Sequence, residues 1–393
     1  MNVDEMSGSR GRPHFYFWAS IIAAVVGLAL SVYVWRAVTL RENRQAELAL
    51  SARANSHALI LQNGIDESLA RITALRALFQ SDSEVSRREF EVFSEFLLRD
   101  QTAMRAVSWI PRITRANLVA HELAAARDGL PRYQIKSIAA DGSLVPSAEA
   151  GEYFPIFYST NGSSGSPLYG LNLNDGGFRQ QALERARDLD QLTSTPNFML
   201  HRGIGDRNGF LVVLPVYQSG LPHDTVEDRR SNLVGFVQGV FQTGKLIETI
   251  LRTSTPAGLD LYFFAAVSDG DLPPLYFRPS RLRAGAIAES RAVLTAGPHR
   301  SEVLSVGDVR WTLIATPIPG GPATSRHFDG WLMLTCGLLV TWIAVAYIWA
   351  SGRRSAASLN TLNEHFQAAL NNMVQGLVMF DASERLLICN SQY

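Results

Sequence analysis

Two long stretches of the chain carry no charged side chain. They run from residue 15 to 35 and from residue 330 to 352 of a 393-residue sequence. At about 1.5 Å of helical rise per residue, each is long enough to cross a hydrocarbon core of roughly 30 Å. Because a backbone in lipid must satisfy its own hydrogen bonds, both stretches are predicted to be helices. Aromatic residues at their ends are typical of the membrane–water interface.

The first stretch could also be a cleaved signal peptide. Its apolar run exceeds the roughly 7–15 residues of a signal-peptide core, and no clear small-x-small cleavage site follows it. We therefore expect a retained anchor. The predicted transmembrane helices cover residues 15–38 and 330–352, after a cytosolic tail over residues 1–14.

Basic residues next to the two stretches predict the orientation. Arg10 and Arg12 precede the first stretch, and Arg353 and Arg354 follow the second. Short basic flanks favour the cytosolic side. This predicts a multi-pass protein of the inner (plasma) membrane with both termini cytosolic and residues 39–329 periplasmic or extracellular. Three arginines oppose this orientation, although long segments translocate largely regardless of charge: Arg36, Arg41 and Arg44.

After the first stretch, apolar or small side chains recur in steps of three and four. No proline interrupts residues 40–79, and Gly64 is the single glycine there. The spacing is a heptad pattern, which predicts one long helix over residues 39–80. Two interpretations stay open. The stripe pairs with its twin in a homodimer, which we favour, or it packs on its own domain. Its members are Ala58, Leu61, Ile65, Ser68, Ile72, Leu75 and Phe79.

The rest of the outside segment alternates helical patterns with apolar, strand-like runs. Helices are predicted over residues 83–98, 118–127 and 177–189, and the clearest strands are FLVVLPVY and LVGFVQGVF. The pattern predicts an α+β fold with largely antiparallel strands. Its length suits two sheet-containing subdomains, a membrane-distal one over residues 81–245 and a membrane-proximal one over residues 246–329.

A third helical pattern follows the second stretch. Apolar or small side chains there keep a seven-residue spacing, which predicts a cytosolic linker helix over residues 353–372. Residues 373–393 then form a strand, a turn and a second strand. One hairpin cannot bury a core, so we expect the sequence to stop within a domain.

Composition and motifs exclude several functions. Lys and Arg number 36, as do Asp and Glu, and no basic cluster stands out, which argues against a nucleic-acid partner. The cysteines, Cys336 and Cys389, both lie outside residues 39–329, so that segment must be stable without disulfides. His121 and Glu122 lack the second histidine of a zinc helix. We therefore expect no catalytic residue, metal or cofactor.

The sheet itself is the best candidate for a binding site. Gly235 and Gly239 would leave room on one face for a small molecule or for a close-packed helix. A mostly apolar hollow with a few polar groups, such as Asn172, Thr193 and Tyr217, would suit a small ligand. An ordinary packed core is the alternative.

Residues 78–252 resemble the CHASE domain, the extracellular sensory module of many bacterial receptors and of plant cytokinin receptors. The most specific part is P-V-Y followed, after the loop LPHDTVEDR, by G-x-V-x-G-V-F. The resemblance implies a long N-terminal helix, two PAS-like subdomains, a dimer, and a ligand site in the membrane-distal subdomain. It places Asn172 where an aspartate commonly holds the ligand, Thr193 on a pocket threonine, and Pro215 and Tyr217 on the pocket-side strand. An amide cannot supply a charged acceptor, which argues against cytokinin-like recognition.

The tail resembles the opening of a bacterial PAS domain. It shows L-x-x-M-x-x-G-L-x-M-F-D-x-x-x-R-L-x-x-x-N, which ends at Asn390. In similar proteins, GGDEF and EAL domains that make and degrade cyclic di-GMP commonly follow, and a histidine kinase follows less often.

These features predict a transmembrane signal-transduction receptor. A small molecule would bind the outside domain and regulate a cytosolic output through the PAS domain, with a cyclic di-GMP cyclase or phosphodiesterase as the main expectation. The sensor part of a membrane histidine kinase and a protein-binding membrane adaptor are the alternatives. An extracytosolic enzyme is disfavoured because no catalytic constellation stands out.

Overall fold

The protein is described from a computed structural model, which divides the chain into two compact units. One unit holds residues 46–324, and the other holds residues 1–45 together with residues 325–393. The residues that the structure describes are 11–81, 84–99, 103–139, 141–160, 168–199, 208–255, 257–265, 273–283, 285–321, 324, 328–372, 374–375, 377–381 and 385–389.

Helix α1 (Gly11–Ser81) runs through both units. The unit that contains both termini is built on the first part of α1, up to residue 45, and on α8 (Phe328–Asn371). Both are long and apolar enough to cross a membrane, and their most apolar windows are almost unburied, which a soluble core helix would not be. Within this unit the two helices approach through small residues. A Cβ built on Gly27 would lie 2.5 Å from Thr341, and one on Gly337 would lie 2.5 Å from Ser31. Such close contacts are typical of helix pairs in lipid.

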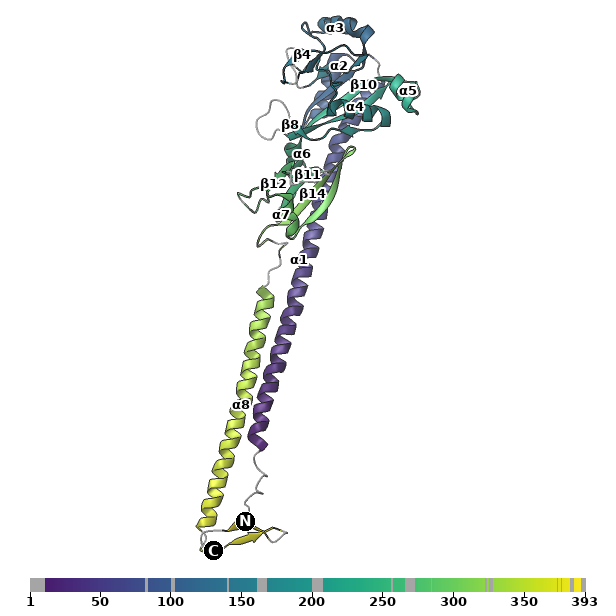
Figure 1. Cartoon of the computed structure of the whole chain (residues 1–393). Coiled ribbons are helices and arrows are strands. Elements are labelled where there is room, and N and C mark those ends of the chain that lie inside the picture. The colour runs from purple at the N-terminus through teal and green to yellow at the C-terminus, as the bar shows by residue number, and fades with distance from the viewer. Residues whose placement is uncertain are drawn as a thin grey trace. The chain divides into compact units, whose positions relative to one another are not determined.

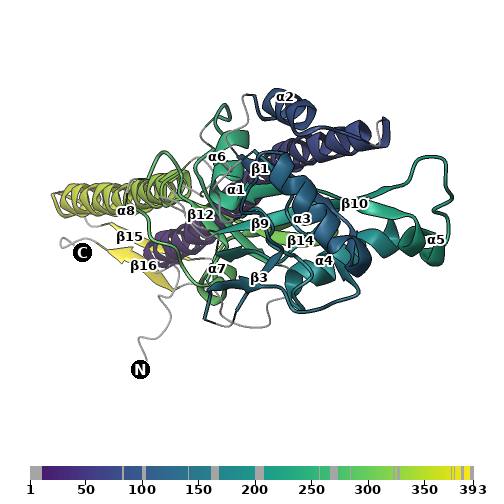
Figure 2. The same ribbon diagram turned by 90° about the horizontal axis from the view of Figure 1, so that it is seen from above.

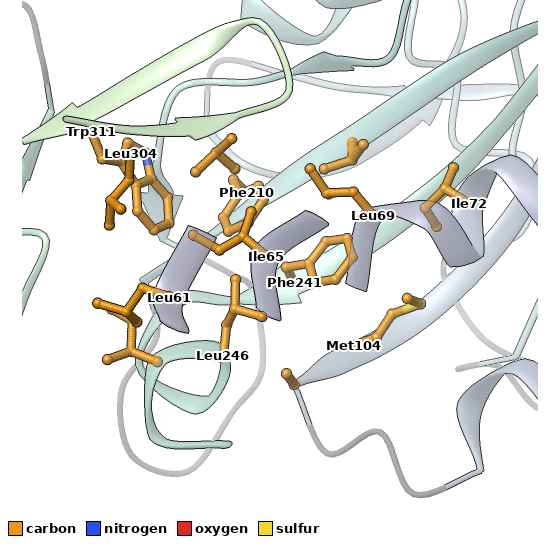
Figure 3. Close-up of a cluster of buried hydrophobic side chains, with 14 of the residues drawn as sticks. Leu61, Ile65, Leu69, Ile72, Met104, Phe210, Phe241, Leu246, Leu304 and Trp311 are labelled. Carbon is orange, nitrogen blue, oxygen red and sulfur yellow. The ribbon is translucent and has the colours of Figure 1, made fainter. Parts of the chain in front are cut away.

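In the other unit, α1 packs one apolar stripe against two sheets, which lie one after the other along it (Figure 1). Leu61, Ile65, Ile72 and Leu75 are each at most 1% exposed. Figure 3 shows Leu61, Ile65, Leu69 and Ile72 among Phe210, Phe241, Leu304 and Trp311, which come from both sheets. In the structure, therefore, the heptad stripe packs on its own domain, which is the second of the two interpretations of the sequence. That stripe is not available to a partner helix.

The larger sheet is antiparallel and has six strands. Their order is β6-β1-β10-β9-β7, with β8 paired to β9 beside this path. One face packs on α1, and α4 (Phe178–Leu189) covers the opposite face (Figure 2). The strands are β1 (Met104–Pro111), β6 (Tyr158–Ser159), β7 (Thr193–Ser194), β8 (Phe198–Met199), β9 (Asn208–Tyr217) and β10 (Leu233–Gln242).

The smaller sheet has four antiparallel strands in the order β12-β11-β14-β13. Helix α6 (Thr243–Ile250) comes between the two sheets in the sequence. Strand β13 was not foreseen. It is joined to β14 by the two residues Gly307 and Asp308, and Gly307 has a φ of 65°, which a glycine adopts without strain. The elements are β11 (Leu259–Ala265), β12 (Tyr276–Arg278), α7 (Arg291–Ala296), β13 (Arg300–Val306) and β14 (Val309–Pro317).

Shorter elements complete the first sheet's surroundings. Helix α2 (Arg87–Leu98) begins later than residue 83, because Ser86 and Glu89 form a reciprocal capping box at its start. Ser83 lies outside the described residues. The others are β2 (Ile113–Thr114), the 3₁₀ turn η1 (Arg115–Asn117), α3 (Leu118–Arg127), β3 (Lys136–Ile138), β4 (Leu144–Pro146), β5 (Glu152–Tyr153) and α5 (Val226–Ser231).

The tail forms the hairpin that the sequence predicts. Strand β15 (Val378–Phe380) pairs with β16 (Leu386–Cys389) in an antiparallel sheet of two strands. Asn390, at the end of the PAS-like pattern, lies outside the described residues. A hairpin is common to many folds, so the PAS domain stays a prediction.

Candidate functional site

On the face of the six-stranded sheet that α4 covers, buried polar side chains follow one line across the strands. Ser108 pairs with Ser159 on one side and with Gln238 on the other. Gln238 pairs with Val213, and Val213 pairs with Thr193. Directly paired residues share a face, and Val213 belongs to the apolar cluster under α4. We call Ser159, Ser108, Gln238 and Thr193 the polar row; each is at most 8% exposed.

One buried oxygen atom of the polar row has no hydrogen-bond partner among the residues that the structure describes. Ser108 donates a hydrogen bond to Ser159 Oγ at 3.1 Å, and Thr193 donates to the carbonyl of Gln191 at 3.4 Å. The buried Oε1 of Gln238 accepts no hydrogen bond from any residue that the structure describes. A buried acceptor without a partner costs about 1–3 kcal/mol. A hydrogen-bond donor brought to this oxygen would remove that cost.

Gln238 was missed in the sequence. It stands at a variable position of G-x-V-x-G-V-F, inside the otherwise apolar run LVGFVQGVF. A lone uncharged polar residue in a fully buried strand was the signal that could have found it, because such a residue needs a hydrogen-bond partner.

Asn172 lies in the same region but is already engaged. Its side chain is 3% exposed. Its Oδ1 accepts hydrogen bonds from the backbone N–H groups of Phe154 at 2.9 Å and Asn174 at 3.2 Å. Its Nδ2 donates to the carbonyl of Asn174 at 3.4 Å. These contacts make Asn172 a support for the loop backbone and leave its amide oxygen little capacity for a ligand.

Tyr217 and Pro215 lie on β9, on the α4 side of the sheet. The Tyr217 hydroxyl donates to the carbonyl of Arg187 at 2.6 Å, and its ring stacks on His223. Burial raises the pKa of Tyr217 above its usual value, so the hydroxyl stays protonated. Tyr217 therefore ties β9 to α4. Pro215 pairs with Phe236 in the row next to the polar row.

The two candidate glycines make room for other parts of the protein. A Cβ on Gly239 would lie 2.5 Å from Cδ1 of Ile72, so this glycine lets α1 approach the sheet. A Cβ on Gly235 would lie 2.4 Å from the carbonyl oxygen of Ile110 on β1. The sequence left open whether these glycines make room for a small molecule or for a close-packed helix. At Gly239 the structure shows the close-packed helix, α1. Thr193 and Pro215 thus share the face of Gln238, and Gly239 lies on the other face.

An open hollow of about 510 Å³ lies beside β6 at the edge of this sheet. This volume falls within the range of roughly 300–1,000 Å³ usual for small-molecule sites. Ser159 belongs both to its lining and to the polar row, so the hollow borders one end of that row. The described lining residues are Glu91, Glu95, Leu98, Arg99, Ser159 and Thr160.

Above the same edge, aromatic rings surround one arginine. The Arg87 guanidinium lies 4.9 Å from the ring centre of Tyr158 and 5.5 Å from that of Tyr169, and it pairs with Asp128 at 2.9 Å. Next to them, burial lowers the pKa of His121 to about 4, and its Nε2 lies 3.1 Å from the Tyr133 hydroxyl. His121 is therefore uncharged near neutral pH, and the cluster serves to hold α2 and α3 to the strands.

Comparison with known proteins gives a family for this part of the chain. Residues 83–276 match the family model of the CHASE domain. The chain is 21% identical over 390 residues to hybrid signal transduction histidine kinase A of Dictyostelium discoideum, which covers 94% of this chain and 18% of that protein. It is 27% identical over 247 residues to "Probable histidine kinase 4" of Oryza sativa subsp. japonica. That alignment covers 59% of this chain and 23% of the rice protein. The chain thus spans about a fifth of the length of these curated relatives.

Solved sensor domains resemble the chain only distantly. The periplasmic sensory domain of the Campylobacter jejuni chemoreceptor Tlp1 has a TM-score of 0.43 at 10% identity, over 71% of this chain and 97% of that one. The ligand-binding domain of the Pseudomonas aeruginosa PAO1 amino acid chemoreceptor PctC, in complex with GABA, has a TM-score of 0.37 at 11% identity. The match covers 67% of this chain and 97% of that domain. The family match stands on the sequence: residues 83–276 of this chain match the CHASE domain, and the chain is related in sequence to two proteins that are named as histidine kinases.

Proposed function

We propose that the chain is the sensor portion of a membrane histidine kinase. The CHASE domain would bind a small molecule outside the cell and bias a kinase on the cytosolic side. Both curated relatives are named as histidine kinases, and one of them aligns with almost the whole chain. They favour the kinase alternative over the cyclic di-GMP output that the tail suggested, for which neither gives support.

The polar row is the proposed ligand site. The observation that carries the proposal is Oε1 of Gln238, which is buried and accepts no hydrogen bond within the described part of the chain. An amide oxygen accepts a hydrogen bond from a neutral or a cationic donor. The row itself consists of two serines, a glutamine and a threonine, so it offers no charge to balance a buried ion. We therefore infer an uncharged ligand with at least one N–H or O–H donor, held by Gln238 and bordered by Thr193.

A signal then requires that the ligand bind two arrangements of the receptor with different affinity. In our proposal, both chain termini lie in the cytosol and α1 pairs with its twin in a homodimer. The apolar stripe of α1 is buried in its own domain, so the dimer would use the opposite face of the helix. On that face, Leu48 is 64% and Leu59 is 63% exposed.

Two further exposed residues, Ala52 and Asn55, lie between these leucines and complete a heptad spacing. Ala52 is small enough to let two helices approach closely. Asn55 is polar, and a single polar residue in the seam of two paired helices sets their register at a cost in stability. The proposed contact is therefore weaker than a fully apolar seam, which suits a dimer that must change its arrangement on signalling.

A thermal-shift screen of the full chain in detergent against uncharged metabolites tests the proposed function. A ligand at about 100 times its dissociation constant stabilises the folded state by about 2.7 kcal/mol, which raises the melting temperature by several degrees. Gln238→Leu keeps the side-chain size but removes the acceptor, so we expect ligand affinity to fall by about tenfold or more and the thermal shift to shrink with it. Gln218→Leu, at an exposed position just after β9, is the matched control and should keep the shift.

Two results would count against the proposal in different ways. Unchanged affinity in Gln238→Leu would move the site away from the polar row. A screen without any hit, together with recovery of a bound protein from cells, would favour the adaptor alternative.

A further inference from the structure

The hairpin β13–β14 of the smaller sheet contacts the larger sheet at one edge. At its turn, Asp308 accepts a hydrogen bond from the backbone N–H of Ser194 on β7, with 2.7 Å between Ser194 N and Oδ1. The other carboxylate oxygen, Oδ2, accepts from Nε of Arg185 on α4 at 3.0 Å. Arg185 in turn donates to the carbonyl of Ser194 at 3.1 Å. These three residues close a ring of hydrogen bonds between the two sheets.

This ring touches both elements that border the proposed ligand site. Ser194 directly follows Thr193, the last member of the polar row, and α4 covers the face on which the row lies. The side chain of Asp308 is 22% exposed, so its charge is only partly screened by water. Gly307 brings the turn this close, since a Cβ there would lie 2.7 Å from Ser194 Oγ.

The same hairpin is also fixed to α1. The backbone N–H of Ser305 donates to Gln62 Oε1 at 2.8 Å, and Gln62 Nε2 donates to the carbonyl of Ser305 at 3.1 Å. The Gln62 amide thereby pairs with the outer strand much as a neighbouring strand would. Leu304 and Val306, on either side of Ser305, are each 1% exposed and pack in the core that α1 shares. A shift of this hairpin must therefore disturb its contacts with α1.

We propose that Asp308 is a latch that couples the polar row to α1 through the β13–β14 hairpin. A molecule that contacts Thr193 displaces β7, and Ser194 carries that displacement to the Asp308 carboxylate. Strand β14 ends at Pro317, and the chain enters α8 at Phe328, so the hairpin also leads towards the second membrane helix. This inference rests on the proposed function for its ligand, but the coupling itself is a property of the protein alone. By linkage, the free energy that couples the polar row to α1 is the same in both directions.

Hydrogen exchange measured by mass spectrometry on the full chain in lipid nanodiscs, without any ligand, tests the latch. Asp308→Asn keeps the shape but places an N–H donor or a neutral oxygen against Arg185. We expect exchange of the backbone amides in residues 300–317 to rise on the order of three- to tenfold. Glu302→Gln removes a carboxylate from the same hairpin away from the turn, and it should leave this exchange unchanged.

A double-mutant cycle separates coupling from simple stabilisation. Thr193→Val disturbs β7 at the polar row, and it should change exchange in residues 300–317 in the native background. In the Asp308→Asn background, that change should disappear. Effects that simply add, or an Asp308→Asn hairpin that exchanges like the native one, would overturn the latch. Arg185→Gln opens the same ring from α4 and serves if Asp308→Asn fails to fold.

The failures of the two proposals can be told apart. A ligand that binds and depends on Gln238, together with additive effects in the cycle, removes the latch and keeps the sensor. Coupling in the cycle, together with an empty ligand screen, keeps the latch and removes the small-molecule sensor.

Discussion

Gly235→Ala should lower the free energy of unfolding by about 3 kcal/mol or more, whereas Gly239→Ala should lower it by about 1 kcal/mol. The difference follows from what each new methyl group would meet. At Gly235 the nearest atom is the Ile110 carbonyl oxygen at 2.4 Å, and the backbone of β1 cannot move aside without breaking the sheet. At Gly239 the nearest atom is Cδ1 of Ile72, the far end of a side chain that can rotate.

Thermal unfolding of the two variants in detergent, followed by tryptophan fluorescence, measures this difference. Native and variant proteins should be compared at equal concentration, because any dimer makes the melting temperature depend on concentration. A Gly239→Ala protein that melts at or below the temperature of Gly235→Ala would contradict the packing described for these glycines.

Ile72→Ala is expected to cost about 2–5 kcal/mol of stability, and Leu59→Ala less than about 0.5 kcal/mol. Ile72 is fully buried between α1 and the six-stranded sheet, so truncation leaves a cavity. Leu59 is 63% exposed on the opposite side of the helix. Light scattering run beside the unfolding measurement separates folding from assembly. Leu59→Ala should weaken any dimer and leave the fold intact.

The opposite pattern would revive the dimer along the buried stripe. If Ile72→Ala dissociated a dimer without lowering the stability of the monomer, the stripe would have to face a partner chain.

Much of the architecture could be predicted because it depends on local patterns. The two uncharged stretches, the unbroken helical spacing up to residue 80 and the apolar runs of β9 and β10 each extend over many consecutive residues. The partner of the long helix could not be predicted, because a heptad stripe packs equally well on a twin helix or on a sheet. Strand β13 was missed because RSEVLSV carries few apolar residues, and its Gly307–Asp308 turn was the better signal.

The candidate site shows the same limit at the level of atoms. The sequence and the resemblance pointed to Thr193 and Pro215, which do lie on one face with Gln238. Whether these residues hold a ligand stays a prediction. The sequence could not show that the Asn172 amide supports the backbone of Phe154, nor that Oε1 of Gln238 accepts no hydrogen bond from the residues that the structure describes. Both depend on which strands become neighbours, and only the fold determines that.

Accessibility of single cysteines in intact cells tests the central claim that the CHASE domain and the tail lie on opposite sides of the membrane. Ser219→Cys, in a protein whose Cys336 and Cys389 are replaced by serine, places the single thiol at an exposed turn after β9. In a second protein that carries Cys336→Ser alone, the native Cys389 reports on the tail. A membrane-impermeant maleimide should label Ser219→Cys in intact cells and should reach Cys389 only after the cells are opened. Labelling of both thiols under the same condition would place them in one compartment and contradict the transmembrane sensor.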